Sequence, residues 1–502
     1  MAEGQQGNDD PPKQQPGNEA TPLEVQTGQA EDVNAAITGL EPPEAPYFRP
    51  YMSVEFVVTA LGAILVIWSF CWLYVGAFWN PSTRLSNLHV AVLDCDVTPP
   101  PASLNASFAP LLPALLPAPL ASQLLAGSVW NRSSPLGPRL LHWEPASCGE
   151  AGGAGAGCGP REAECVASLA SSVLQGETWA LLYFPANFTA AYLAWWRDSG
   201  VAGAGAGGAG GRKQPPTATY YYARGRDYST HSYLSSLVLS SLGPALSAAL
   251  TRQLAASPAA AGGRLEPLFL ATGISIAPVD LAPVRNFGQH FASYIFCVLL
   301  WLGSSFVVAA SYQFKLPTEM ALAIDPRVGG GRQVRLRHLA WALLVKGLVA
   351  AGFMFLEMVL LCVVLWCLGA GGSGAQWHWS AGQAIAFGWY MSWSFLSVNA
   401  VLLHALGPDR FSSASAALLI AQLTSASAIM SQELQNRVFY VGQALPFFYG
   451  VRGFRSIFFG TLTDKMWINW LVLTAYNVVF LPLGLLLVVR RVWRNSGRGA
   501  QQ

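Results

Sequence analysis

The sequence predicts a membrane α-helical bundle of about six transmembrane helices, with a mixed α/β extracytosolic domain between the first and second helices. Three observations support this fold class. Hydrophobic residues make up 52% of the 502 residues and charged residues only 11%, whereas soluble proteins are about one quarter charged. Several apolar runs are long enough to cross a bilayer, and basic residues cluster between them. The net charge of +2 does not favour nucleic acid as a partner.

Residues 1–50 are predicted to form a disordered cytosolic tail. They are rich in Gly, Gln, Pro and acidic residues and have almost no aromatic residue before Tyr47. Such a segment cannot bury enough apolar surface to offset the entropy that it would lose on ordering. No short basic region lies close to residue 1, so we expect no cleaved signal peptide. For the acidic residues, binding of a partner is the alternative.

Six apolar runs are predicted to span the membrane. The first, at 56–79, has 24 residues without a charge, which gives about 36 Å of helix against a hydrocarbon core of about 30 Å. The other five runs lie at 291–310, 343–368, 383–406, 411–430 and 467–489. The fifth is rich in Ser, Thr and Ala, and such small residues suit an inner helix of a bundle. Five spans are the alternative count.

Basic residues predict the orientation of the spans, because Lys and Arg near helix ends mark the cytosolic side. The link between the second and third spans carries Lys315, Arg327, Arg332, Arg335 and Arg337. The basic cytosolic tail at 490–502 carries four more Arg residues, whereas the link at 369–382 has none. An even number of spans then places both termini in the cytosol. We expect a multi-pass protein of the plasma membrane or of a secretory-pathway membrane.

Three glycosylation sequons fall within the segment that this orientation places outside the cytosol. Asn105, Asn131 and Asn187 each begin an Asn-x-Ser/Thr sequon with a middle residue other than Pro. A modified sequon must face the lumen or the exterior. Because the sequons are confined to residues 80–290, they predict a glycoprotein whose outer segment is this one.

Four cysteines of the same segment predict at least one disulfide. Cys95, Cys148, Cys158 and Cys165 form an even set in a compartment that permits disulfides, and three pairings remain open. A zinc site is the weaker interpretation, because the set has no C-x-x-C pair and no His within it. No metal site or cofactor is predicted.

Residues 80–290 are predicted to fold as a domain with its own core. Runs rich in β-branched and aromatic residues favour strands at 88–93, 179–184 and 218–223. Apolar residues at helical spacing favour helices at 163–174 and 233–253. Two Gly/Ala tracts, at 149–157 and 202–211, are predicted to be flexible surface insertions.

Glu357, near the centre of the third span, is the main candidate for a functional polar group within the membrane. An ionised carboxylate there is costly, so we expect it to be protonated, paired or facing water. Lys346 lies 11 residues earlier, about 16 Å along the helix and too far to pair. Asn399 of the fourth span and Asn477 of the sixth are candidate partners. Two hypotheses remain: a polar pathway for a substrate, ion or proton, and a protonated carboxyl that holds helices in register.

Residues 431–465, between the fifth and sixth spans on the outer side, are predicted to form a re-entrant or interfacial element. Gly442 and Pro446 would break a continuous helix. An apolar stripe with helical spacing follows, formed by Phe447, Val451, Phe454 and Phe458. Arg452 and Arg455 fall off this stripe. A broken helix pair is tolerated only where protein or water satisfies its free backbone groups; a plain interfacial helix is the alternative.

No catalytic constellation is apparent, so we expect no enzymatic activity. The chain has no G-x-S-x-G, H-E-x-x-H or phosphate-loop Lys motif. The missing phosphate loop argues against ATPase activity within this chain.

The sequence resembles the fungal nitrosoguanidine-resistance membrane proteins over about residues 48–490. The most specific segments are GQALPFF at 442–448 and RSIFFGT at 455–461, followed by Asn469. Further matching segments are GAFW at 76–79 leading into the strand at 88–96, WALL at 179–182, NFT at 187–189 and YYYAR at 220–224. The acidic tail and the Gly/Ala tracts depart from the family pattern.

The resemblance implies the permease half of an ABC-2-type exporter, with six spans, a large outer domain after the first, and short re-entrant helices before the sixth. It implies export of, or resistance to, toxic compounds, or a role in membrane lipid homeostasis. It also implies membrane lipids as partners, a homodimer, and a separate ATPase or regulatory partner, since family members lack a nucleotide-binding domain. The alternative is a non-transporting receptor or scaffold whose outer domain binds a partner.

Overall fold

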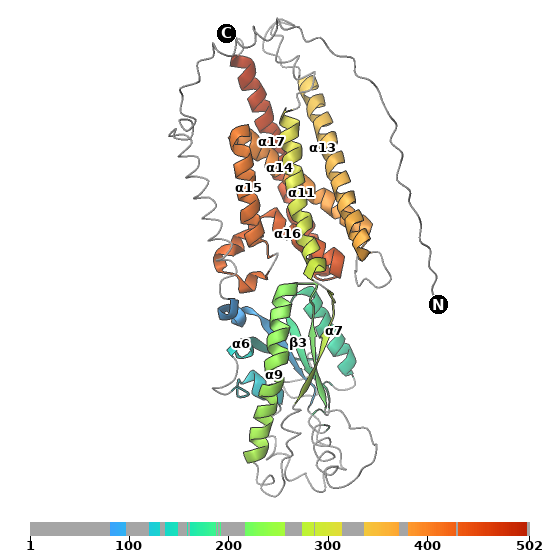
Figure 1. The fold of residues 1–502 in the computed structure, drawn as a ribbon, viewed down its shortest axis with the longest axis vertical. Coiled ribbons are helices and arrows are strands. Elements are labelled where there is room, and N and C mark those ends of the chain that lie inside the picture. The colour runs from blue at the N-terminus through green and yellow to red at the C-terminus, as the bar shows by residue number, and fades with distance from the viewer. Residues whose placement is uncertain are drawn as a thin grey trace, which may run out of the picture. The chain divides into compact units, whose positions relative to one another are not determined.

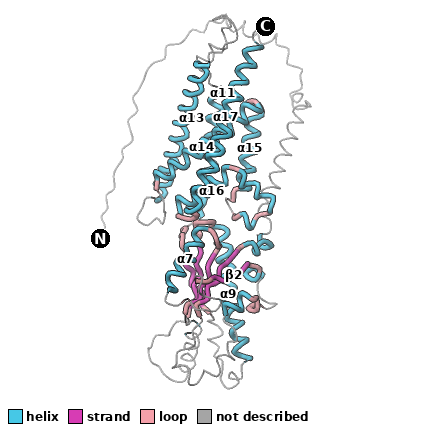
Figure 2. The backbone as a smooth tube through the Cα atoms, turned by 180° about the vertical axis from the view of Figure 1, so that it is seen from behind, coloured by secondary structure: helices cyan, strands magenta, loops and turns pink. Residues whose placement is uncertain are grey.

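The computed structural model describes most of the chain after residue 80, in the ranges 81–96, 120–130, 136–148, 158, 161–186, 188, 191, 216–256, 274–285, 287–313, 336–370, 380–427 and 430–498. The predicted tail at 1–50, the first predicted span at 56–79 and both Gly/Ala tracts lie outside these residues. The described part is mostly helical and contains one mixed β-sheet (Figures 1 and 2).

The sheet has five strands in the order β2-β1-β3-β4-β5. Strand β1 (His89–Asp94) pairs in parallel with β2 (His142–Ala146) and β3 (Ala180–Phe184). Strand β4 (Thr217–Tyr222) is antiparallel to β3 and parallel to β5 (Ser275–Asp280). The three strands predicted from the sequence are therefore the three central strands, and the mixed α and β character of this region is confirmed.

The two strands that the sequence did not predict, β2 and β5, lie at the two edges of the sheet. Each contains a proline, Pro145 in β2 and Pro278 in β5. Proline cannot donate a hydrogen bond to the sheet, and in strands it is confined mainly to edges. Proline makes these two strands difficult to recognise in the sequence, and it is also compatible with their positions at the edges of the sheet.

Helices cover both faces of the sheet. Alternate residues of β1, such as Val90 and Val92, pack in a cluster with the helix α9 (Tyr228–Ala256). The residues between them, Ala91 and Leu93, pack on the opposite side with the helix α7 (Glu162–Gln175). Figure 1 shows α7 and α9 beside the sheet. Among the described residues this region also contains three shorter helical segments, the 3-10 helix η2 (Pro81–Asn87), α5 (Leu120–Leu125) and α6 (Leu136–Arg139).

Residues after β5 form a helical bundle. Its long helices are α11 (Phe287–Gln313), α13 (Leu336–Leu365), α14 (Ala381–Leu406) and α17 (Met466–Arg498). Each overlaps a helical segment that is long and apolar enough to cross a membrane, namely Gly288–Gln313, Ala340–Leu368, Ala381–Leu406 and Thr463–Arg491. These four segments correspond to the second, third, fourth and sixth predicted spans, and they identify a membrane protein.

The fifth predicted span corresponds to α15 (Pro408–Ser425), a helix of 18 residues. It does not belong to the four membrane-length apolar helices of the described residues. Its Ser, Thr and Ala residues lower its hydropathy, as the sequence indicated. The small elements that follow are the 3-10 helices η6 (Gln432–Leu434) and η7 (Arg437–Ala444), the helix α16 (Pro446–Phe459) and the 3-10 helix η8 (Thr463–Lys465).

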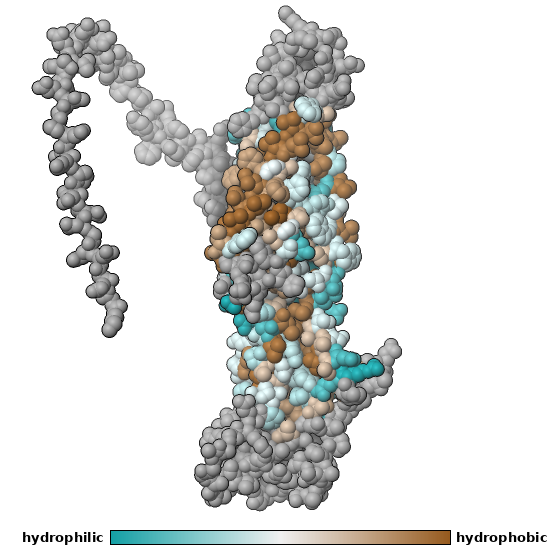
Figure 3. All heavy atoms as spheres, turned by 90° about the vertical axis from the view of Figure 1, so that its right-hand side faces the viewer, coloured by the Kyte–Doolittle hydropathy of each residue, from teal (hydrophilic) through white to brown (hydrophobic). Residues whose placement is uncertain are grey.

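The outer surface of the bundle is apolar. In Figure 3, hydrophobic residues gather over the helices of the bundle. Large exposed side chains are concentrated on α13 and α17, including Leu348, Phe353, Leu360, Leu471, Val478 and Leu486. A contiguous apolar surface of this kind is expected where lipid, and not water, surrounds the helices. Burial is greatest for α14, where 56% of the apolar segment is buried, against 11% in α17.

Candidate functional site

Glu357 of α13 faces α11 at a glycine. A Cβ atom at Gly303 of α11 would collide with the Glu357 carboxylate, so the missing side chain at this position makes room for the acid. Among the described residues, none donates a hydrogen bond to this carboxylate or forms an ion pair with it. The acid therefore lies against a neighbouring membrane-length helix, and no described residue pairs with it.

Asn399, the first predicted partner of Glu357, joins a different network. Its Nδ2 donates a hydrogen bond to Ser304 Oγ of α11 over 2.9 Å, and its Oδ1 accepts one from Ser415 Oγ of α15 over 2.7 Å. All three side chains are buried. This network connects α14 to two neighbouring helices, so that α15 is attached to the bundle by a polar contact.

The second predicted partner, Asn477 of α17, has a buried Oδ1 without a hydrogen-bond partner among the described residues. Gln422 of α15 is a further such residue, which the sequence analysis missed. It is only 1% exposed, and both polar atoms of its amide are unpartnered within the described structure. Gln422 lies seven residues, two helical turns, after Ser415 and thus on the same face of α15.

The structure brings Glu357 and Asn399 to the same level of α11 but not into contact with each other. Glu357 lies against Gly303 and Asn399 binds Ser304, the next residue. Consecutive residues of an α-helix point about 100° apart, so the two groups lie on different flanks of the helix. The bundle thus holds several polar groups among its helices, and only some of them have a hydrogen-bond partner among the described residues.

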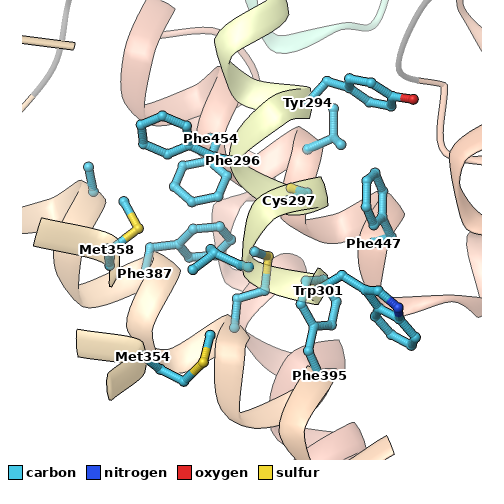
Figure 4. Packing of buried hydrophobic residues seen from close by; sticks show 14 of the residues in the cluster. Tyr294, Phe296, Cys297, Trp301, Met354, Met358, Phe387, Phe395, Phe447 and Phe454 are labelled. Carbon is cyan, nitrogen blue, oxygen red and sulfur yellow. The ribbon is translucent and has the colours of Figure 1, made fainter. Parts of the chain in front are cut away.

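The predicted element at 431–465 is built around α16. Pro446 occupies the first turn of this helix, and η7 ends before it, so the chain breaks near the predicted positions Gly442 and Pro446. The predicted stripe is confirmed: Phe447, Val451, Phe454 and Phe458 are all buried. Figure 4 shows Phe447 and Phe454 beside residues of α11 and α14, including Phe296, Trp301, Phe387 and Phe395.

Three glycines permit the close packing of this element. A Cβ atom at Gly450 would collide with Met391, one at Gly453 with Phe387, and one at Gly442 with the backbone of Ser425. Helix α16 therefore packs directly against α14, and it also contacts α11 and α17. Protein surrounds it, which is the condition that the sequence analysis set for a broken helix of this kind.

Arg455 of α16 forms a buried ion pair with Asp227, at the start of α9. Its Nη1 lies 3.3 Å from Asp227 Oδ2, and the two side chains are only 7% and 2% exposed. Asp227 also caps α9, because its Oδ1 accepts a hydrogen bond from the backbone N–H of Thr230 over 2.9 Å. Burial raises the pKa of Asp227, and the positive charge of Arg455 opposes this shift.

Two histidines and a second arginine lie around this pair. Arg226 stacks over the Trp179 ring at 3.8 Å and donates a hydrogen bond to Thr178 O. His231 is buried beside Trp179 with neither ring nitrogen bonded to a described residue, and burial lowers its pKa well below the usual value of 6.5. His290 Nε2, at the start of α11, accepts a hydrogen bond from Tyr228 N over 3.3 Å. We refer to Arg226, Asp227, His231, His290 and Arg455 as the junction cluster.

Both ends of the 431–465 element also bind the sheet region. Ser431 N donates to Thr230 Oγ1, and Arg84 Nη1 and Asn87 Nδ2 donate to the carbonyls of Leu434 and Glu433. Beyond α16, Leu462 N donates to Leu174 O at the end of α7. The element thus contacts the sheet region at η6, at α16 and before η8, so the two parts share a hydrogen-bonded interface.

Arg452, the second predicted arginine, is half-buried, and its Nε has no partner among the described residues. Sequence analysis named Arg455 but missed its partner. Asp227 directly precedes a helix, and an acid at that position is a capping signal. Its pairing with a residue 228 positions away leaves no local pattern. The sequence did not single out Ser304 or Ser415. Each lies in a predicted span with several serines, and no pattern distinguishes the serine that forms a hydrogen bond.

The four cysteines form two disulfides, Cys95–Cys158 and Cys148–Cys165. The prediction of a disulfide is confirmed, and the structure selects one of the three pairings. Both bridges lie beside α7, whose first turn contains Cys165. The three predicted glycosylation residues, Asn105, Asn131 and Asn187, lie outside the described residues.

Comparison with known proteins places the chain in a family. No curated protein and no solved structure matches it. Residues 59–481, which include the described sheet, the helices α11 to α16 and about half of α17, match the model of one family. The chain belongs to the family described as Protein of unknown function (DUF3533).

Proposed function

We propose that this chain is a permease-like membrane protein that moves lipids or amphipathic toxic compounds, or regulates their movement. Its arrangement would be that of an ABC-2 permease with six spans, the segments 56–79 and 411–430 adding to the four membrane-length helices. Resemblance to the nitrosoguanidine-resistance proteins supports a role in drug resistance or lipid homeostasis. Because the chain lacks a phosphate loop, an energy-driven process would need a separate ATPase, and a homodimer would complete the permease.

The observation that carries this proposal is the group of polar side chains at the centre of the bundle. Glu357 and Asn477 lie within membrane-length apolar helices and Gln422 lies near the end of α15, and each has polar atoms without a partner among the described residues. Unsatisfied polar groups in a membrane interior are expensive, and they are retained mainly where function requires them. Such groups could bind the head group of an amphipathic substrate that passes between the helices.

The junction cluster supports coupling between the sheet region and this bundle. Helix α16 packs on α11 and α14, the two helices that carry Gly303, Ser304 and Asn399. Its Arg455 is paired with Asp227 at the end of the sheet region. A ligand or partner that moves α9 would therefore move α16 and alter the packing of the bundle. In this proposal the sheet region and the 431–465 element lie on the same, extracytosolic side, and both termini are cytosolic.

The test is a comparison of Glu357→Gln with a matched substitution on the lipid-facing side of the same helix, Leu360→Met. Both introduce an uncharged side chain of similar volume, and Leu360 is 55% exposed. We expect E357Q to lose most of the resistance to an amphipathic toxin, or most of the translocation of a fluorescent lipid, at an unchanged amount of protein in the membrane. L360M should match the unmodified chain. Equal activity of all three proteins would contradict the proposal.

A receptor or scaffold is the second candidate, and the sheet region favours it. That region has two hydrophobic clusters of its own and two disulfides, so it can present a rigid binding surface. Under this hypothesis, replacing residues 82–285 by a short linker abolishes function while E357Q leaves it intact. Under the permease hypothesis E357Q alone is sufficient to reduce it.

A further inference from the structure

Two histidines and a glutamate meet on one face of the sheet, at its β2 edge. His89 begins β1 and His142 begins β2, and the two residues are direct partners in the parallel register. Glu144, two residues after His142, points to the same face of the sheet. Its partner in β1 is Ala91, whose small side chain leaves the carboxylate free to reach across toward His89.

The potential ligand atoms of these residues are close together. His89 Nδ1 lies 2.7 Å from Glu144 Oε1, and His142 Nε2 lies 3.1 Å from the same oxygen. One ligand atom from each residue can be chosen so that all three lie within 4.8 Å of one another. In a tetrahedral zinc site with bonds of about 2.0–2.2 Å, neighbouring ligand atoms are about 3.3–3.6 Å apart. Small side-chain movements would therefore bring all three atoms to an ion.

We propose that His89, His142 and Glu144 form a zinc-binding site on the edge of the sheet. Two imidazoles and one carboxylate are a ligand set that zinc accepts, and three protein ligands leave a fourth position open. The side chains are 48%, 52% and 41% exposed, so an ion can enter from solvent. The open position would hold water or a donor atom from a partner. Each neutral imidazole can offer the nitrogen that faces Glu144 Oε1 to an ion when its proton lies on the other ring nitrogen, while the carboxylate offers an oxygen.

A surface ion pair is the competing explanation of the same geometry. One carboxylate oxygen can accept a hydrogen bond from each of two imidazoles without an ion between them. An exposed pair of this kind contributes little to stability, and it gives no reason for two histidines to stand side by side with ring centroids 4.6 Å apart. A bound ion explains why the three side chains lie together, because each of them would supply one of its ligand atoms.

Zinc titration of the purified full-length chain in detergent, after removal of metal with a chelator, tests the site. The unmodified chain should bind one zinc ion more than the variants His89→Ala, His142→Ala and Glu144→Gln, or bind it at least about tenfold more tightly. Loss of a residue that only supports a ligand already costs about 10–100-fold in affinity. The matched control is Glu164→Gln, which changes an exposed carboxylate of α7 in the same region and should leave zinc binding unchanged.

Background binding by the free thiols Cys297, Cys362 and Cys367 is the same in all of these proteins, so the difference between them reports the site. Because E144Q preserves volume and lies on an exposed edge, its thermal unfolding should match that of the unmodified chain without zinc. Added zinc should raise the unfolding temperature of the unmodified chain and not that of E144Q. Absence of zinc binding by the unmodified chain at micromolar concentrations would overturn the proposal, and so would variants H89A and E144Q that bind zinc as tightly as the unmodified chain.

Discussion

Two acids inside this protein have opposite surroundings. Asp227 is buried in the junction cluster, where Arg455 pairs with one oxygen and the backbone of Thr230 donates to the other. Glu357 lies between α11 and α13, where only the absent side chain of Gly303 makes room for it. The difference separates two environments of a carboxylate: Asp227 is fixed by an ion pair and a helix cap, whereas Glu357 has no hydrogen-bond or ion-pair partner among the described residues.

The largest expected effect comes from removing the partner of Asp227. Arg455→Met should destabilise the folded chain by about 3–5 kcal/mol, because it leaves a buried carboxylate without a compensating charge. Thermal unfolding of the purified protein in detergent measures this change. The double variant Asp227→Asn, Arg455→Met should recover part of the loss, since the asparagine keeps an oxygen for the cap of α9 and carries no charge.

Arg452→Met is the matched control for this experiment. Arg452 lies on the same helix, three residues earlier, and is half-buried without an ion pair among the described residues. It should cost far less than Arg455→Met. Similar losses in the two variants would mean that the ion pair is not what stabilises the contact.

The next effect concerns the space that Gly303 leaves for Glu357. Gly303→Ala should cost about 1–3 kcal/mol, as overpacking does in a well-packed core, and it should also reduce transport because it displaces the carboxylate. Gly352→Ala on α13 is the control, since a Cβ atom there meets nothing within 4 Å. Unfolding in detergent, followed by the resistance assay, separates the two outcomes. An unchanged G303A protein would show that the close approach is not needed.

The pH dependence of the free energy of unfolding tests another buried group beside Asp227, namely His231 of the junction cluster. Burial lowers the pKa of His231, and the charges of Arg226 and Arg224 lower it further. The unfolded chain binds a proton below about pH 6.5 while the folded chain does not. The stabilisation is therefore present above that pH and is lost as the pH falls below it, by up to about 1.4 kcal/mol per pH unit. In His231→Asn the free energy of unfolding should depend less on pH between 7 and 5, and an identical dependence would rule out His231 as its source.

The smallest effect is expected in the Asn399 network, where no charge is involved. Asn399→Ala should cost about 0.6 kcal/mol and at most about 1.7 kcal/mol, the range measured for hydrogen bonds between membrane helices. Ser415→Ala removes one of the two contacts and should cost less. Unfolding measurements on both variants and on the double variant would reveal the coupling. A loss in S415A larger than that in N399A would contradict the network as described.

Much of this architecture was predictable from local patterns. Uninterrupted apolar runs located α11, α13, α14 and α17, because only a helix satisfies its own backbone in lipid. Helical spacing located the buried stripe of α16, and the even number of cysteines indicated disulfides. Each of these signals comes from a single segment of the sequence or from the number of residues of one type. They can therefore be recognised without knowledge of tertiary contacts.

What could not be predicted depends on pairing between distant segments. The sequence suggested Asn399 as a partner of Glu357, but Asn399 binds Ser304 and Ser415, and only the rotation of α14 against α11 decides between these partners. Asp227 and Arg455 are 228 residues apart. The edge strands β2 and β5 were missed because their prolines contradict a strand pattern. Such features are set by packing and not by periodicity.

The prolines at the two rims of the sheet have a consequence for self-association. Pro145 and Pro278 interrupt the row of donors that a bare strand offers to a neighbour, which is one way in which proteins avoid edge-to-edge aggregation. A strand from a second copy of the chain would therefore form few backbone hydrogen bonds with either edge strand. We expect copies of this protein to associate within the bilayer through the exposed apolar surfaces of their helices, while their sheets remain separate.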